Sequence, residues 1–560
     1  MTSSLDLEPV FPSRRSPVFG RGGMVASSQP LATAAGLEIL SQDGNAADAA
    51  VATAATLSVT EPTSTGLGGD MFSLFFEAAT GQMTALNGSG RAPASLTLDL
   101  LRKDGFGVGA HHIHSEENAS PLPPYHPFTI TVPGACAGWC DLIERHGTLS
   151  LPKILAPAIH LAEEGFPVAP VTSHFWQRAA EKLLNESLNG REMTIGGRGP
   201  NPGELFRNPG LARTLRTIAA GGKEAYYEGE IAEVISATVQ QAGGCLAMDD
   251  LAAHVSTWDE PISTDRDGLR LWECPPNGQG ITALLALNIL EGFDLPSDPL
   301  CADRLHLEIE ALRLAFADTR WFVADPRMVR VPMDELISKE YAAERRKLIN
   351  PQKATIDQLR GTPVAGSDTV YFCVVDKWGN ACSFINSNYM GFGTGIVPHG
   401  WGFTIQNRGH NFSLEPGHPN ALAPGKRPYH TIIPAMITRE ADGSLFGPMG
   451  VMGGFMQPQG HLQLFLSLAQ GLDPQSALDM PRFCIGDEKA AGEVALEHGI
   501  SSETIAGLMS RGHPVKEVTG WERALFGRGQ VILRDPATGV LTAGSDPRAD
   551  GCAMTLGSYG

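Results

Sequence analysis

The segment 366–395, GSDTVYFCVVDKWGNACSFINSNYMGFGTG, constrains the fold of this 560-residue chain more than any other stretch. Two runs rich in β-branched and aromatic residues, VYFCVVD and NACSFINS, flank the turn Lys377-Trp378-Gly379. This pattern predicts a β-hairpin, and apolar residues on both faces of each strand indicate that both faces are buried. A strand pair of this kind lies in a sheet that other layers cover. Thr369 stands at the start of its first strand.

The segments around this hairpin predict helices first and strands later. Two alanine-rich runs, 30–44 and 45–62, have the composition of helices. Asn45 and Asp48 suit the start of the second helix, because short polar side chains cap free backbone N–H groups. The pattern stays mostly helical from 130 to 350. Further strands are expected at three places: 402–408, 430–440 and 444–452. The sequence therefore predicts α/β layers whose two parts share one core.

Composition excludes several classes of function. A net charge of −19 would repel both a nucleic-acid backbone and an anionic membrane, so we expect neither as a partner. No segment reaches the roughly 18 apolar residues of a membrane span. The first 23 residues have no apolar core, which predicts no secretory signal. The nine cysteines form no CxxC pairs, as expected of a reduced, cytoplasmic protein.

Motifs for several familiar chemistries are also absent. The sequence has no G-x-S-x-G elbow, no H-E-x-x-H pair and no Walker A loop. Its glycine-rich runs lack the G-x-G-x-x-G form that binds dinucleotides. No His or Cys cluster completes a zinc site. We therefore expect neither a metal nor an organic cofactor.

Several motifs along the chain resemble one family. The chemistry-bearing ones are the run from Thr369 through Asp376, Gly379-Asn380, Phe392-Gly393-Thr394-Gly395, Gly425-Lys426-Arg427-Pro428 and Gly453-Gly454. Together with GNAADAAVATAATLSVTEP, EALRLAFADTRWFVADP and VPMDELISKEYAAERR, they are similar to the γ-glutamyltransferase family of N-terminal-nucleophile (Ntn) hydrolases. The match runs from about residue 20 to the end.

Within that family, the chain looks most like the glutathione-hydrolase-like branch, which is related to oxamate amidohydrolase. The runs SFINSNYMGFGTG, QNRGHNFSL and GGFMQPQGH carry this closer likeness. The resemblance implies a four-layer αββα Ntn-hydrolase sandwich, formed jointly by two processed chains.

The family implies a mechanism with Thr369 as the nucleophile. The Thr369 hydroxyl would attack the carbonyl of Asp368 and cut the chain there. We expect an irregular arm over 1–20, a mostly helical large chain over 21–368, and a small chain over 369–560. The freed α-amine would then act as the base, since an amino terminus titrates near pH 7.7–8.0. The hydroxyl would attack a substrate amide, and water or an amine acceptor would take the acyl group.

Three further positions complete the implied catalytic group. The backbone N–H groups of Gly453 and Gly454 would stabilise the developing oxyanion. Ser387 falls where the family has a second threonine, and its hydroxyl can bond to the Thr369 amine. Taken alone, a threonine that opens a strand is usually a β-branched strand residue, and a glycine pair is usually a turn. The many matching positions favour the catalytic interpretation of Thr369 and of the glycine pair.

The positions that hold a glutamyl group in the family differ in this chain. The arginine that binds the α-carboxylate is replaced by Ser89, with Arg91 two residues further on. The positions that face the α-ammonium, and the serine pair after Lys-Arg-Pro, are occupied by other residues: Tyr389, Arg408, Asn411, His430 and Thr431. Compared with the family, these positions lose a carboxylate and gain a cation. This change favours a substrate group that carries only a carboxylate over a zwitterion that also carries an ammonium. The Arg408 fork suits a carboxylate, and a structural ion-pair partner is an equal alternative.

Three functions stay open on the sequence. The first is hydrolysis or transfer of γ-glutamyl groups, as in glutathione. The second keeps the Ntn mechanism but acts on a different small acyl amide, of the oxamate or glutaryl type. The third is an unprocessed, non-catalytic scaffold. For the two enzymatic functions, we expect a small-molecule amide, water or an amine acceptor, and a heterodimer of the two cleaved chains.

Overall fold

Two seven-stranded sheets form the centre of the computed structural model, which describes residues 15–107, 120–355, 367–486 and 492–557. The first sheet has the strand order β19 (Cys552–Thr555), β2 (Met24–Ser27), β10 (Ser367–Val375), β11 (Ala381–Met390), β3 (Asp70–Glu77), β4 (Gln82–Gly88) and β7 (Thr257–Asp259). The second has the order β1 (Val18–Gly20), β18 (Leu541–Ser545), β17 (Arg528–Arg534), β13 (Leu445–Met452), β12 (Ala435–Arg439), β9 (Leu269–Glu273) and β8 (Ile262–Arg266). Each sheet combines strands from before and after Thr369.

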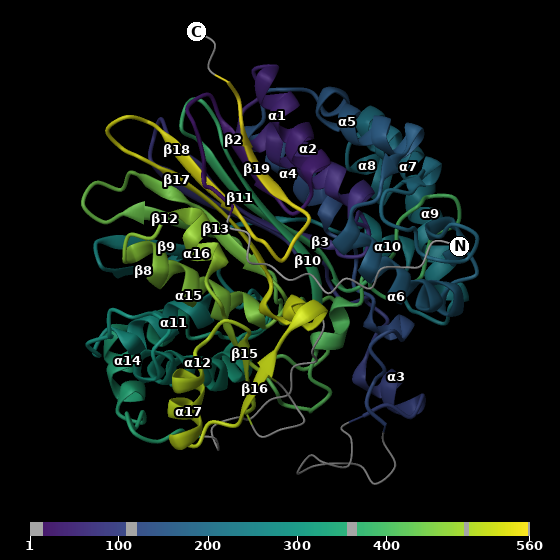
Figure 1. The fold of residues 1–560 in the computed structure, drawn as a ribbon. Coiled ribbons are helices and arrows are strands. Elements are labelled where there is room, and N and C mark those ends of the chain that lie inside the picture. The colour runs from purple at the N-terminus through teal and green to yellow at the C-terminus, as the bar shows by residue number, and fades with distance from the viewer. Residues whose placement is uncertain (1–14, 108–119, 356–366, 487–491, 558–560) are drawn as a thin grey trace, which may run out of the picture.

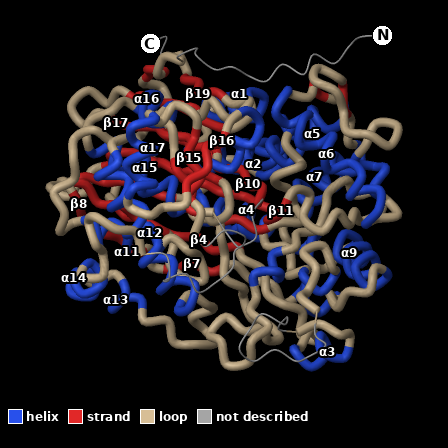
Figure 2. Tube along the Cα trace, turned by 60° about the horizontal axis from the view of Figure 1, so that its bottom comes forward, coloured by secondary structure: helices blue, strands red, loops and turns tan. Residues whose placement is uncertain are grey.

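Helices cover the outer faces of both sheets, as Figure 1 shows. The first sheet is covered by α1 (Pro30–Ser41), α2 (Ala46–Thr60) and α4 (Ala135–His146). The second is covered by α11 (Ile281–Leu290), α15 (Met456–Ala469) and α16 (Pro474–Asp479). Figure 2 shows the strands in red at the centre with the blue helices around them. The predicted four-layer αββα sandwich is confirmed.

Further helices pack on these layers. Outside α2 lie α5 (Leu151–Glu164) and α7 (Pro209–Gly221), and then α6 (Pro170–Glu186) and α9 (Glu230–Gln241). On the other side, α12 (Ala302–Phe322) and α14 (Lys339–Arg346) pack on α11. A small sheet of β14 (Phe483–Ile485), β15 (Val494–Glu497) and β16 (Val515–Val518) completes this side.

The local signals explain why the central elements form. Asn45 accepts hydrogen bonds from the N–H groups of residues 47 and 48, and the Asp48 carboxylate accepts from the Asn45 N–H. The two residues expected at the start of α2 thus form a capping box. The turn of the β10–β11 hairpin is held by Asp376. Its Oδ1 accepts from the Trp378 N–H, and its Oδ2 accepts from the Ala46 N–H at the start of α2. One carboxylate thus joins the hairpin to its covering helix.

Two predictions about local structure were wrong. Residues 402–408 form no strand, because their backbone groups bond to loops: Gln406 N–H donates to Gly68 O, and Ile405 O accepts from Thr394 N–H. The arm predicted over 1–20 ends in strand β1, which pairs with β18 through Val18 and Ala543. Three residues with one exposed phenylalanine carry too short a pattern to reveal an edge strand. The rest of the arm, 1–14, lies outside the described residues, as do residues 356–366 before β10.

The two sheets meet face to face across an apolar layer. Tyr371 of β10 and Ile385 of β11 pack there against residues of β12, β13 and β17. The closest approach leaves no room for a side chain on β13, because a Cβ at Gly450 would lie 2.5 Å from Cε2 of the Tyr371 ring. Close packing of this kind fixes the position of β10, and so of Thr369, relative to β13.

We therefore expect Gly450→Ala to lower the free energy of unfolding by about 1–3 kcal/mol, the usual cost of overpacking a core. Urea unfolding followed by fluorescence measures the effect. The penalty should shrink in a Tyr371→Leu background, because the smaller side chain leaves room for the added methyl group. An equal penalty in both backgrounds would contradict this packing.

Candidate active site

Thr369 lies at an irregularity between two central strands. The pairs Asp368↔Tyr389 and Val370↔Asn386 enclose one residue of β10 but two residues of β11. Such a β-bulge is common beside active sites because it redirects a side chain. Thr369 is fully buried, and Tyr389 after the bulge has a φ of 75°, in the left-handed region that a bulky residue rarely adopts.

Ser387 links Thr369 to its surroundings. Its Oγ lies 2.9 Å from Oγ1 of Thr369, whereas the sequence analysis expected a bond to the Thr369 amine, which stays a prediction. The same oxygen accepts from the Tyr389 N–H at 2.8 Å and from Nη2 of Arg408 at 3.0 Å. Two N–H donors on one hydroxyl oxygen favour donation of the Ser387 hydrogen to Thr369.

Arg408 is a buried cation beside this pair. It begins the short 3₁₀ helix Arg408–Asn411, and its Nη1 donates to Oγ1 of Thr431 at 2.6 Å. Its guanidinium lies 4.5 Å from the centre of the Tyr389 ring. Burial lowers the pKa of Arg408 to about 10, which still leaves it charged at neutral pH. Within the described ranges it forms no ion pair, and its Nε has no partner. A buried charge without a counter-ion marks a functional site candidate.

A second buried pair, Asp70 and His430, lies next to Arg408. Oδ2 of Asp70 accepts from Nε2 of His430 at 2.9 Å, and Nδ1 of His430 accepts from the Ile432 N–H at 3.3 Å. Burial and the Arg408 charge lower the pKa of His430 to about 3, so the ring is neutral. Burial alone raises the pKa of Asp70, but the His430 hydrogen bond and the Arg408 charge outweigh it and hold that pKa below its usual range.

The glycine pair lies at the end of β13, immediately before α15. Gly453 has a φ of 133° and Gly454 a φ of 59°, values that side chains rarely allow. In the part of the chain that the structure describes, neither N–H donates to a protein acceptor. The Gly454 carbonyl accepts from Nε2 of Gln279 at 2.9 Å, and the same nitrogen donates to the Thr431 carbonyl at 2.7 Å.

These contacts form one continuous chain of hydrogen bonds from Thr369 to the glycine pair. It has six members: Thr369, Ser387, Arg408, Thr431, Gln279 and Gly454. A buried hydroxyl, a charged fork and a glycine turn with free N–H groups are thereby held together. This arrangement suits attack on an amide and stabilisation of the resulting oxyanion.

The other predicted site residues have partners of their own. Arg91 pairs with Asp325 at 3.2 Å, and buried Ser89 accepts from Asn277 at 3.1 Å. The Asn411 side chain donates to the Tyr429 carbonyl at 3.2 Å. The chain of hydrogen bonds does not join these three residues to Thr369.

The sequence analysis missed Asp70 and Gln279. Asp70 ends the glycine-rich run 64–70, where its Oδ1 accepts from the N–H groups of Gly90 and Gly134 and from Gln406. The available signal was a single acid directly before the apolar strand MFSLFF. Gln279, in the run PPNGQG, carried no signal beyond its place between a strand and a helix.

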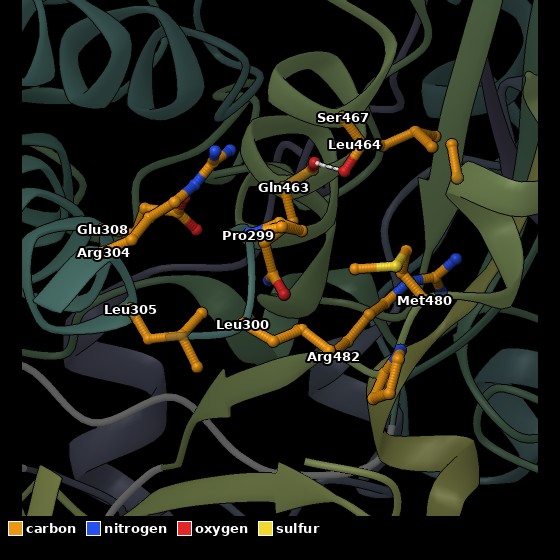
Figure 3. Close-up of a pocket in the computed structure, with 12 residues that line it drawn as sticks. Pro299, Leu300, Arg304, Leu305, Glu308, Gln463, Leu464, Ser467, Met480 and Arg482 are labelled. Carbon is orange, nitrogen blue, oxygen red and sulfur yellow. Dashed lines mark hydrogen bonds and ion pairs between the residues drawn. The ribbon is translucent and has the colours of Figure 1, made fainter. Parts of the chain in front are cut away.

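Two other features of the described residues do not add to this site. His306, Glu310 and His513 are close enough to hold a metal ion, but Nη1 of Arg313 donates to both Glu310 and His513, so an ion would have to displace a guanidinium. A cavity of about 20 Å³ lies between α12 and the segment from α15 to Arg482 (Figure 3). It has room for about one water molecule, and no residue of the hydrogen-bonded chain lines it.

Comparison with known proteins shows that the chain has the fold of the Ntn amidohydrolases. Over 99% of both chains it is similar to the crystal structure of a cephalosporin acylase from Bacillus halodurans, with 45% identity and a TM-score of 0.89. The γ-glutamyltranspeptidase family model matches residues 32–556, and the chain belongs to that family. The resemblance in the sequence analysis is confirmed.

Two relatives within the family are similar to this chain over nearly its whole length. The glutathione hydrolase-like YwrD proenzyme of Bacillus subtilis is 36% identical over 96% of this chain and 99% of its own length. The oxamate amidohydrolase proenzyme of Klebsiella pneumoniae is 34% identical over 95% and 98%. The chain is thus an enzyme of the glutathione hydrolase-like amidohydrolase type, in a family of self-processing proenzymes. Nothing in these comparisons supports the non-catalytic scaffold. Among the described residues, no helix is both long and apolar enough to cross a bilayer.

The neutral state of His430 makes a pH dependence of stability testable. Its folded-state pKa lies below the unfolded value of 6.5, so the unfolded chain binds an extra proton as the pH falls from about 6.5 towards 3. Between pH 7 and pH 5 this group should cost about 2 kcal/mol of stability. In His430→Gln the loss over this range should be smaller by that amount, as measured by urea unfolding. His160→Gln, at an exposed position on α5, should keep the wild-type dependence, and equal slopes in all three proteins would contradict a buried neutral His430.

Proposed function

We propose that the chain cuts itself between Asp368 and Thr369 and then hydrolyses amides through a Thr369 acyl-enzyme. The hydroxyl attacks the Asp368 carbonyl, the peptide becomes an ester, and water releases the 1–368 and 369–560 chains. The freed α-amine takes the proton from the Thr369 hydroxyl when a substrate amide is attacked. The observation that carries the proposal is the hydrogen-bonded chain from Thr369 through Arg408 to Gly454.

The other members have defined roles in this proposal. The N–H groups of Gly453 and Gly454 donate to the oxyanion, where one such donor is typically worth about 3 kcal/mol. Ser387 orients the Thr369 hydroxyl and later its amine. Water takes the acyl group in hydrolysis, and an amine acceptor takes it in transfer. The two chains stay together as a heterodimer, because each sheet contains strands of both. Nine free cysteines support a reducing, cytoplasmic location.

For the substrate, we propose an amide whose acyl part carries a carboxylate. Arg408 offers a charge with no counter-ion within the described part of the chain, and Tyr389 and Thr431 flank it. The nearby carboxylate of Asp70 already accepts four hydrogen bonds, which leaves it poorly placed to bind a substrate ammonium. A plain acid therefore fits better than the zwitterion of a γ-glutamyl group. In this proposal, His430 supports Arg408 from behind without touching the substrate. Ser89, Arg91 and Asn411 line the sides of the substrate site.

Two substrate classes remain as candidates. An oxamate- or glutaryl-type amide fits the cation of Arg408, and one relative is named an oxamate amidohydrolase. A γ-glutamyl compound such as glutathione is the second candidate, because another relative is named glutathione hydrolase-like. The Arg408 environment favours the first.

Processing is tested on a denaturing gel. The wild type should give two bands that sum to 59.5 kDa, and the smaller should begin Thr-Val-Tyr-Phe. Thr369→Ala should stay one band and be inactive, because it lacks the hydroxyl. Thr56→Ala, at a buried threonine of α2 whose hydroxyl has no partner, should be processed normally. Processing of Thr369→Ala at the same bond would refute the assignment.

Substrate recognition is tested with Arg408→Gln. For a glutaryl anilide or oxamate, kcat/KM should fall about 10- to 150-fold, the value of hydrogen bonds to a charged group at 1.5–3 kcal/mol. An uncharged butyryl anilide should be affected far less. Arg91→Gln, whose parent residue pairs with Asp325, should keep the wild-type preference for the charged substrate. An equal loss on both substrates would instead indicate a structural role for Arg408, and turnover of γ-glutamyl compounds alone would favour the second candidate.

A further inference from the structure

Gln279 is a fully buried residue of the 1–368 part, and within the described ranges its side-chain hydrogen bonds all reach the 369–560 part. It lies between β9 and α11. Its Nε2 donates to the carbonyls of Thr431 and Gly454 at 2.7 and 2.9 Å. Its Oε1 accepts from the Tyr429 hydroxyl at 3.1 Å. A carboxamide has two N–H hydrogens, and here each has its own acceptor.

The two carbonyls belong to residues on opposite sides of the proposed substrate: the oxyanion-binding glycine turn and the threonine that holds Arg408. The distance between these two sides must match the substrate. Gly454 carries one of the N–H groups proposed to bind the oxyanion. Thr431 accepts the hydrogen bond from Arg408, the group proposed to bind the substrate carboxylate. The planar amide therefore sets the separation between the glycine turn and the arginine. A glycine backbone has the most conformational freedom of any residue, so an external hydrogen bond on Gly454 restricts it strongly.

We propose that Gln279 is a positioning residue that determines which acyl length the enzyme prefers. The inference rests on the proposed function. A substrate must place its scissile carbonyl at Gly453-Gly454 while its carboxylate reaches Arg408. The number of atoms between these two groups must match the distance that Gln279 holds fixed. The large chain thereby contributes to specificity without touching the substrate.

A merely structural amide would satisfy the same carbonyls but would not affect selectivity. The two roles differ in one measurable ratio, the preference among chain lengths. The test is to measure kcat/KM for a series of dicarboxylic monoamides that differ by one methylene group each: oxamate, malonamate, succinamate and glutaramate. Each value is taken per processed molecule, counted from the small-chain band on a denaturing gel.

In Gln279→Met, which keeps the volume but loses the polar atoms, kcat on the best substrate should fall roughly 10- to 100-fold, as for a small misplacement of catalytic groups. The preference between the best substrate and its neighbour one methylene away should drop towards unity. Gln475→Met is the matched control. Gln475 is also buried, and its amide also bonds to backbone, but it joins α16 to β18 at Ser545. It should keep the wild-type preference.

Gln279→Glu provides a second variant of nearly the same shape. Its carboxylate cannot donate to either carbonyl, but the protonated acid can donate to one. Its kcat relative to wild type should therefore rise as the pH falls from 7 to 5. A Gln279→Met enzyme with the wild-type length preference, or a Gln279→Glu enzyme with no relative recovery in acid, would overturn the inference. A wild type that is not processed, or a Thr369→Ala protein that hydrolyses amides, would instead overturn the proposed function.

Discussion

A guanidinium held in the protein interior without a counter-ion costs several kcal/mol unless its surroundings compensate. For Arg408, the compensation comes from two hydroxyl groups, an aromatic face and the more distant charge of Asp70. The hydroxyls belong to Ser387 of β11 and to Thr431, which lies before β12 in the other sheet. The charge therefore joins the two sheets at the position of Thr369. The rest of the site is arranged around it, since Ser387 contacts the nucleophile and Thr431 leads through Gln279 to the glycine turn.

The same arrangement explains why a cut next to Thr369 need not separate the two parts of the chain. Strand β10 lies between β2 and β11; β2 precedes the proposed cut, and β11 and the part of β10 from Thr369 onward follow it. In the other sheet, β12 pairs with β9 across the same division. The covering helices are also mixed, because α11 packs against α15. The strands before and after Thr369 are therefore both needed to complete each sheet.

Sequence patterns predicted the elements whose signals are local. The hairpin around Lys377-Trp378-Gly379 and the Asn45–Asp48 capping box follow from turn chemistry and from spacing within a few residues. Residues 402–408 have the residue pattern of a strand. Their backbone groups bond to loops that lie elsewhere in the sequence, so the prediction of a strand was wrong. Whether Arg408 has an ion-pair partner depends on contacts far away in the sequence, as Arg91 shows by pairing with Asp325, 234 residues away. Asp70 and Gln279 likewise act through contacts that no spacing in the sequence encodes.

The electrostatics of the site also bear on which group can act as the base. His430 has the right side chain, but its Nδ1 accepts from the Ile432 N–H and its Nε2 donates to Asp70. With a pKa of about 3 it has almost no affinity for a proton at neutral pH. Ser387 is occupied by two N–H donors. A free α-amine on Thr369 would titrate near neutral pH, and the nearby Arg408 charge would lower its pKa further, which favours the neutral form that accepts a proton. Under the proposed mechanism, the chain therefore lacks its base until the bond before Thr369 is cut, so that self-cleavage must precede turnover.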